Sequence, residues 1–219
     1  FTGNPAAVMP LEEWLSDAVL QAIAAENNLA ETAFLIPDDS DEADYELRWF
    51  TPTVEVALCG HATLASGHVL LSAAPWRGDM RFRTRKAGIL RVARNGEDAG
   101  YRMELPAYPP VPKALAQIVA ALGGDAIETL WHDGGYALVV YRDAAAVRAL
   151  VPDMRALKKQ GDMLVIATAR GDGDPSGADV VSRAFAPGAG IDEDPVTGSA
   201  HSVLTPYWAA GLGRDSLPG

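Results

Sequence analysis

Residues 48–63 read RWFTPTVEVALCGHAT, and part of this pattern returns at residues 184–197, which read AFAPGAGIDEDPVT. In both stretches a Phe-x-Pro triplet is followed, seven residues after the proline, by a residue of a reactive type. That residue is Cys59 in the first copy and Asp194 in the second, and each is predicted to open a helix rich in small residues. Two matching strand–loop–helix segments indicate two related halves in one chain.

Local patterns give the remaining elements. Helical spacing of apolar residues and N-capping residues such as Ser16 and Asp143 predict helices, and β-rich runs between turn residues predict strands. The predicted helices cover residues 16–27, 59–71, 113–122, 143–150 and 197–212. The predicted strands cover residues 32–36, 45–50, 80–86, 89–93, 101–105, 126–131, 136–141, 163–168 and 180–185.

These strands run in consecutive groups and do not alternate with helices, which is typical of the α+β class. The stretch PAYPPVP at residues 106–112 holds four prolines in seven residues and resists both helix and sheet. We therefore expect two domains, residues 1–106 and residues 107–219.

Bulk composition excludes several classes of function. The chain has 219 residues and a net charge of −11, and such a field repels a nucleic-acid backbone. A single cysteine, Cys59, excludes an internal disulfide. The apolar runs fall short of the roughly 20 residues that a membrane span needs, and no signal peptide is visible. We expect a cytoplasmic protein without a membrane or nucleic-acid partner, although the sequence begins at Phe1.

Glu31 and His61 are the titratable residues that open a predicted strand and a predicted buried helix. Glu31 is either an exposed strand-end glutamate, which spacing alone favours, or a general acid/base that the apolar strand buries. His61 lies beside the unpaired N–H groups of a helix start, and it either packs there or takes part in chemistry. His68, two helical turns further on, is expected to pack.

Asp194 and Pro195 form a good N-cap followed by a proline at the first helical position. Thr197, Gly198 and Ser199 come next, where the glycine would open backbone N–H groups to a ligand. Ser199 lacks the G-x-S-x-G setting of a hydrolase nucleophile, so a hydrogen bond to substrate is the better interpretation.

The histidines and the single cysteine bear on metal binding and on thiol chemistry. The four histidines lack the close spacing of a zinc site, so no metal is predicted. Cys59 could act as a thiolate base activated by a helix N-terminus, but one cysteine excludes a mechanism that uses two thiols. Two helix N-termini, one in each half, attract carboxylates, so a small molecule that carries a carboxylate is the expected ligand.

Five stretches of the chain, in this order, resemble the phenazine-biosynthesis PhzF-like isomerase family. They are GNPAAV at residues 3–8, ENNLAET at 26–32, RWFTP at 48–52, CGHAT at 59–63 and EDPVTGSAH at 193–201. The resemblance implies the diaminopimelate-epimerase fold, in which each of two similar domains is a strand barrel around a central helix, with the site in the cleft between them. It also implies an isomerase without a cofactor, often a homodimer.

The resemblance assigns roles to particular residues. It implies that Glu31, His61, Asp194 and Ser199 are catalytic, and that Gly60, Ala62, Thr197 and Gly198 bind the substrate. Relative to the family, a first strand before Phe1 and the final strands after Gly219 are expected to be missing.

The function expected from these residues is a proton shift that moves a double bond in a small, cyclic or amino-acid-like carboxylate. Glu31 would be the base. Two alternatives stay open: a racemase or epimerase that uses unlike bases, and a non-catalytic binding protein that retains the cleft.

Overall fold

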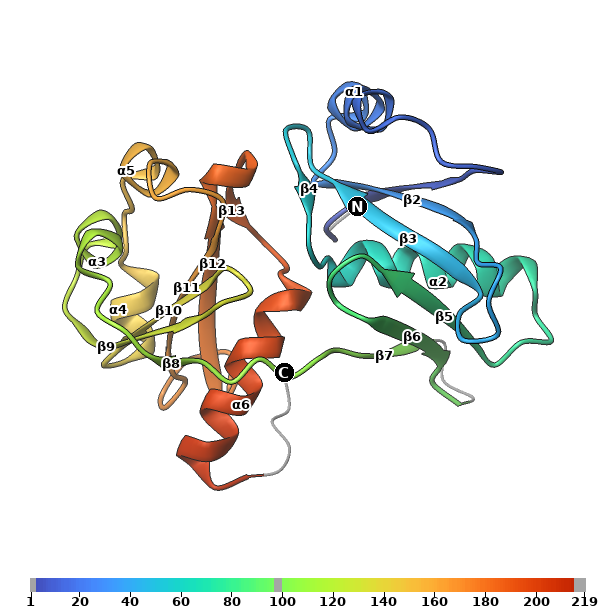
Figure 1. Ribbon diagram of the computed structural model, residues 1–219. Coiled ribbons are helices and arrows are strands. Elements are labelled where there is room, and N and C mark those ends of the chain that lie inside the picture. Colours follow the sequence, from blue (N-terminus) through green and yellow to red (C-terminus); the bar gives the residue numbers. More distant parts are fainter. Residues whose placement is uncertain (1–2, 97–99, 215–219) are drawn as a thin grey trace. The chain divides into compact units, whose positions relative to one another are not determined.

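The structure is a computed structural model that describes residues 3–96 and 100–214. The chain divides into two compact units, Phe1–Pro106 and Ala107–Gly219. Each unit is built on one mixed sheet that curls partly around a helix, and the class is α+β (Figure 1). None of the described helices is both long and apolar enough to cross a membrane.

The first unit folds its sheet around one helix of small residues. Its strands are β1 (Ala6–Pro10), β2 (Glu31–Pro37), β3 (Tyr45–Phe50), β4 (Glu55–Val56), β5 (Asp79–Thr84), β6 (Ile89–Arg94) and β7 (Tyr101–Glu104). They pair in the order β1-β2-β3-β5-β6-β7, and β4 pairs with β3. Helix α2 (Gly60–Ala73) packs against five of these strands, which are β1, β2, β5, β6 and β7 (Figure 1).

Alternation along the strands decides which helix each side chain meets. Helix α1 (Asp17–Asn27) packs Leu20 and Ala24 against Phe34 and Phe50, from the face opposite to α2. Every second residue of a strand points to the same face. The fully buried run at the start of β2 therefore supplies side chains both to the layer that packs against α1 and to the layer that packs against α2.

Close packing fixes the position of α2 on the sheet. A Cβ atom added at Gly67 would lie 2.5 Å from Cγ1 of Val92 on β6, closer than real atoms approach. Glycine is therefore the residue that lets this helix lie so near the strand.

The second unit carries helices on both faces of its sheet. Its strands are β8 (Val111–Pro112), β9 (Ala126–His132), β10 (Tyr136–Tyr141), β11 (Leu164–Arg170), β12 (Val180–Ala186) and β13 (Ile191–Asp194). Helices α3 (Ala116–Leu122), α4 (Ala144–Arg148) and α5 (Met154–Lys158) cover one face. On the other face α6 (His201–Leu212), preceded by the 3-10 turns η1 (Pro187–Ala189) and η2 (Gly198–Ala200), packs Val203 and Trp208 against β10 and β11.

The two units repeat one topology. In the first, β1 and β2 pair in parallel across α1, β3 and β4 follow antiparallel, and α2 comes next. In the second, β10 and β11 pair in parallel across α4 and α5, β12 and β13 follow antiparallel, and α6 comes next. The short repeat seen in the sequence therefore marks a longer correspondence of strands and helices.

Most predicted elements are present to within a few residues, and the differences are informative. The sequence patterns missed the strands β1, β4, β8 and β13 and the helix α5, of which β4 and β8 have only two residues each. Ser16 stands at the N-cap of α1 but its side chain makes no capping hydrogen bond, whereas Asp143 accepts one from the N–H of Ala146. The helix predicted over residues 197–212 begins as a 3-10 turn at Gly198.

Candidate active site

Glu31 and His61 meet where the first strand pair joins the start of α2. Glu31 is the first residue of β2, paired in register with Ala6 of β1, and its side chain is 8% exposed. His61 is the second residue of α2. The Nε2 atom of His61 lies 3.0 Å from Oε2 of Glu31. Of the two interpretations of Glu31, the exposed strand end is wrong.

The contact between these two side chains is close but poorly directed. Neither Oε2 of Glu31 nor Nε2 of His61 makes a hydrogen bond of good geometry with the described residues. Buried polar atoms are nearly always hydrogen-bonded, because an unsatisfied one costs about 1–3 kcal/mol. The unsatisfied carboxylate and imidazole make Glu31 and His61 candidates for a role in chemistry.

Cys59 completes this group from the other side of the imidazole. Its Sγ atom lies 3.6 Å from Nδ1 of His61, and the residue is 5% exposed. Cys59 is also the N-cap residue of α2, and its side chain caps no N–H group of that helix. The imidazole thus has a thiol at one nitrogen and a carboxylate at the other.

The helix start beside Glu31 is rich in hydrogen-bond donors. The leading N–H groups of α2, like those of any α-helix, have no partner within the helix, and its first turn contains no acidic side chain. Gly60, expected to bind substrate, is the first helical residue and is buried. Ala62 is fully buried, and its carbonyl oxygen accepts a hydrogen bond from Ser66, so it offers a ligand no exposed surface.

Asp194 does not cap a helix, and that prediction is wrong. It ends strand β13, where it pairs with Ala184 of β12. Its Oδ2 atom accepts a hydrogen bond from the hydroxyl of Thr197 at 2.8 Å, and Oδ1 accepts one from the N–H of Val196 at 3.3 Å. The carboxylate therefore organises the turn that leads from β13 into the helical segment.

Thr197, Gly198 and Ser199 form the entrance to α6. Thr197 is the N-cap of the 3-10 turn, Gly198 is its first residue, and Ser199 is 8% exposed. The sequence patterns did not mark Ser202, three residues after Ser199, as a candidate site residue. Its hydroxyl is buried and has no hydrogen-bond partner among the described residues. The spacing of three is the signal that could have found it, because residues three apart share a helix face.

The other histidines lie outside these two groups. His68 is exposed, but its ring packs edge-on against Tyr101, with centroids 5.5 Å apart, and its Nδ1 atom lies 3.0 Å from the hydroxyl of that residue, as expected of a packing histidine. The ring of His132 stacks on Tyr108 with centroids 4.6 Å apart. His201 is exposed at the start of α6. Of the four histidines, His61 is the one that meets both a carboxylate and a thiol.

Comparison with known proteins gives one consistent family. The family model described as phenazine biosynthesis-like protein, PhzC-PhzF, matches residues 1–215. An uncharacterized isomerase of Pseudomonas aeruginosa is 49% identical over 222 residues, which cover 99% of this chain and 80% of that protein. The phenazine biosynthesis-like domain-containing protein of Homo sapiens is 39% identical over 237 residues, with 99% and 82% covered.

Solved structures agree with the sequence matches. A PhzF-family protein of Enterococcus faecalis superposes with a TM-score of 0.75 at 41% identity, covering 98% of this chain and 79% of that one. A hydroxyproline epimerase of Agrobacterium vitis, solved with trans-4-hydroxy-L-proline, reaches a TM-score of 0.54 at 13% identity, covering 88% and 63%. The second likeness concerns the fold alone. Strand order, the CGHAT helix start and these matches lead to one conclusion: the chain belongs to the phenazine biosynthesis-like, PhzC-PhzF, family.

Proposed function

We propose that the protein is an isomerase that moves a proton, and with it a double bond, in a small substrate bearing a carboxylate. One observation carries the proposal: the buried Glu31 carboxylate lies 3.0 Å from His61 at the uncapped start of α2. A relative that is 49% identical is named an isomerase, which supports the same class of reaction.

In the proposed reaction Glu31 is the base. Its carboxylate takes a proton from a C–H bond next to an unsaturated carboxylate, and the bonding electrons shift along the conjugated system. The acid formed on Glu31, or the neighbouring imidazole of His61, returns a proton to another carbon. The product has the same atoms as the substrate with its double bond moved, so the reaction needs no cofactor.

The start of α2 is the proposed electrostatic part of catalysis. Its leading N–H groups, among them that of Gly60, would hold an oxyanion that develops when the C–H bond breaks. Removing a single donor of this kind from an enzyme costs about 100-fold to 1000-fold in turnover.

Residues of the second unit are assigned to binding. Asp194 and the hydroxyl of Ser199 supply the polar atoms we expect to hold the amine or hydroxyl substituents of the substrate, and Thr197 and Gly198 shape that segment. Such contacts act on the bound ground state as well as the transition state, so their loss raises KM more than it lowers kcat.

The test is an exchange screen in D2O with small cyclic unsaturated amino acids, followed by NMR. The wild type should introduce deuterium at one carbon while the double bond moves, and Glu31→Gln should lose this activity while its circular dichroism stays native. Wild-type turnover by Glu31→Gln would refute the assignment. Deuterium entering at a single stereocentre without double-bond movement would identify an epimerase instead.

A further inference from the structure

Three side chains with metal-binding atoms gather at the start of α2 from three places in the sequence. Glu31 comes from β2, Cys59 precedes α2, and His61 lies in its first turn. One ligand atom from each lies within 4.8 Å of the other two. In the part of the chain that the structure describes, this is the one such group of histidine, cysteine and carboxylate side chains.

We propose that Glu31, Cys59 and His61 form a binding site for Zn²⁺. Zinc is held by thiolate, imidazole and carboxylate, and sites with three protein ligands leave the fourth position to water or another small ligand. The trio supplies one ligand of each kind. The prediction of no metal rested on the spacing of the histidines, which cannot reveal a site that the fold assembles from distant residues.

The distance between Cys59 and His61 fits such an ion. Bonds of about 2.3 Å to sulfur and about 2.0 Å to nitrogen, at a tetrahedral angle, hold the two ligand atoms about 3.5 Å apart. Sγ of Cys59 lies 3.6 Å from Nδ1 of His61. An ion beside these two atoms also needs one carboxylate oxygen of Glu31. A ligand atom of Glu31 lies within 4.8 Å of one from each of the other two residues, and the carboxylate must shift from Nε2 of His61 toward the ion as it binds.

Charge and burial favour the same occupant. Glu31 is 6% exposed as a residue, and burial of a carboxylate without a cation is unfavourable. A dication bound by one carboxylate, one thiolate and a neutral imidazole makes the group neutral as a whole. The ion also gives Oε2 of Glu31, which lacks a well-directed hydrogen bond, a partner to bind. The thiol releases its proton to solvent as the ion binds.

Occupation of this site would switch the protein off. An ion on the Glu31 carboxylate holds the electron pair that must accept the substrate proton. This inhibitory consequence rests on the proposed function, whereas binding of the ion rests on the geometry of the trio alone.

The experiment measures binding in the absence of any substrate, so its failure is distinct from failure of the proposed isomerase. Apo protein is titrated with Co²⁺ and followed by absorption, since a cobalt–thiolate bond gives an intense charge-transfer band. Zn²⁺ affinity is then measured by competition with a chromophoric chelator. We expect one ion per chain, the thiolate band, and displacement of Co²⁺ by Zn²⁺.

Variants identify the ligands. Cys59→Ser should abolish the band, and Cys59→Ser and Glu31→Gln should each weaken Zn²⁺ binding at least about tenfold. His68→Gln, on the same helix but away from the trio, should bind as the wild type does. Circular dichroism of each variant shows that it is folded, and Cys59→Ala replaces Cys59→Ser if the latter is not. Cobalt binding without a thiolate band, or equal affinity of wild type and Cys59 variants, would overturn the proposal.

Discussion

Glu31 places its Oε2 atom 3.0 Å from Nε2 of His61, yet neither atom has a well-directed hydrogen bond within the described residues. Glu55 in the same unit is the opposite case, because both of its oxygens accept hydrogen bonds from Arg48 at 2.8 Å. One carboxylate is satisfied by the fold, and the other is left available.

The first prediction separates these two roles by stability. Glu31→Gln should change the free energy of unfolding by less than about 1 kcal/mol or raise it, since little native bonding is lost. Glu55→Gln, the matched control, should lower it by about 1–3 kcal/mol because charge-assisted hydrogen bonds are lost. Urea unfolding measures both. A loss for Glu31→Gln as large as that for Glu55→Gln would mean that Glu31 serves the fold.

The second prediction concerns the close approach of α2 to β6. Gly67→Ala puts a methyl group 2.5 Å from Val92 and should destabilise the protein by about 1–3 kcal/mol through overpacking. Gly211→Ala in α6 is the matched control, because no atom lies within 4 Å of the added Cβ. It should stabilise by up to about 1 kcal/mol through helix propensity. Thermal unfolding measures the stability of both variants. Equal changes in stability for Gly67→Ala and Gly211→Ala would contradict the packing account.

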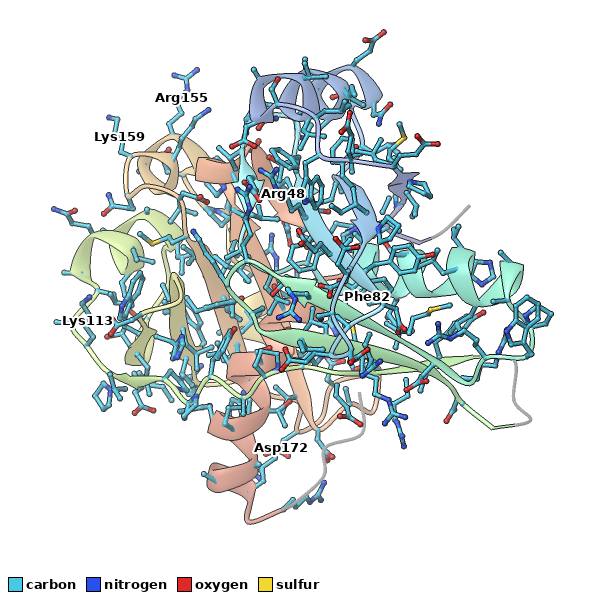
Figure 2. The ribbon with its side chains drawn as sticks, turned by 45° about the vertical axis from the view of Figure 1, so that its right-hand side comes forward. Arg48, Phe82, Lys113, Arg155, Lys159 and Asp172 are labelled. Carbon is cyan, nitrogen blue, oxygen red and sulfur yellow. The ribbon has the colours of Figure 1, made fainter. Side chains whose placement is uncertain are left out.

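The third prediction concerns Arg48, which is labelled in Figure 2. Its guanidinium lies over the rings of Trp14 and Phe50. Its side chain is 3% exposed and bonds both Glu55 and Asp17, and the hydrogen bond to Glu55 raises the pKa of the guanidinium above its usual value. Lysine keeps the charge but loses the two-pronged hydrogen bonding and the stacking. Arg48→Lys should therefore cost about 2 kcal/mol of unfolding free energy.

Arg148 is the control for burial. It makes the same two-pronged contact with Asp174 at 2.8 Å, but its side chain is 58% exposed. The side chain of its partner Asp174 is 2% exposed, so the comparison concerns burial of the guanidinium alone. Arg148→Lys should cost less than Arg48→Lys, because an exposed ammonium group keeps its water. Similar losses for the two lysine variants would show that burial does not govern the strength of these contacts.

The fourth prediction is a pH effect at Asp38. Hydrogen bonds from Ser40 and from Arg83 lower the pKa of this carboxyl from 3.8 to about 2. A carboxyl with a lowered folded-state pKa stabilises the protein above its unfolded pKa and loses that contribution as the pH falls. The contribution of Asp38 should thus disappear between about pH 4 and pH 2.

Asp38→Asn tests this in urea unfolding across the acid range. The variant should be less stable than the wild type near neutrality, and the difference should narrow as the pH falls through this window. Asp39→Asn, at the exposed neighbouring residue, should leave the wild-type profile in place. A constant difference at every pH would refute the role of the Asp38 charge.

Sequence patterns found the elements whose own residues determine them. The strand predicted over residues 45–50 is β3, and the helix predicted over residues 16–27 is α1, because each carries its periodicity within itself. At Asp194 the local pattern predicts the wrong structure. An Asp-Pro pair favours a helix cap, but pairing of β13 with β12 overrides that local preference.

The candidate site divides in the same way. Glu31 and His61 were singled out by type and by position at element starts, but their 3.0 Å contact depends on β2 and α2 coming together. The burial of Glu31 and the nearness of Cys59 to it are likewise tertiary facts, and no spacing within residues 26–63 encodes them. The local pattern favours an exposed glutamate at this position, and only the family resemblance indicates that Glu31 is catalytic.

The contact of Gly67 with Val92 also limits the order in which this protein can change over generations. A side chain at residue 67 becomes acceptable only after residue 92 has lost bulk, because the reverse order passes through an overpacked intermediate. Shrinking Val92 first leaves a gap, which is a milder defect that a methyl group at residue 67 then fills. Substitutions at these two positions should therefore be inherited as a pair, with the strand changing before the helix.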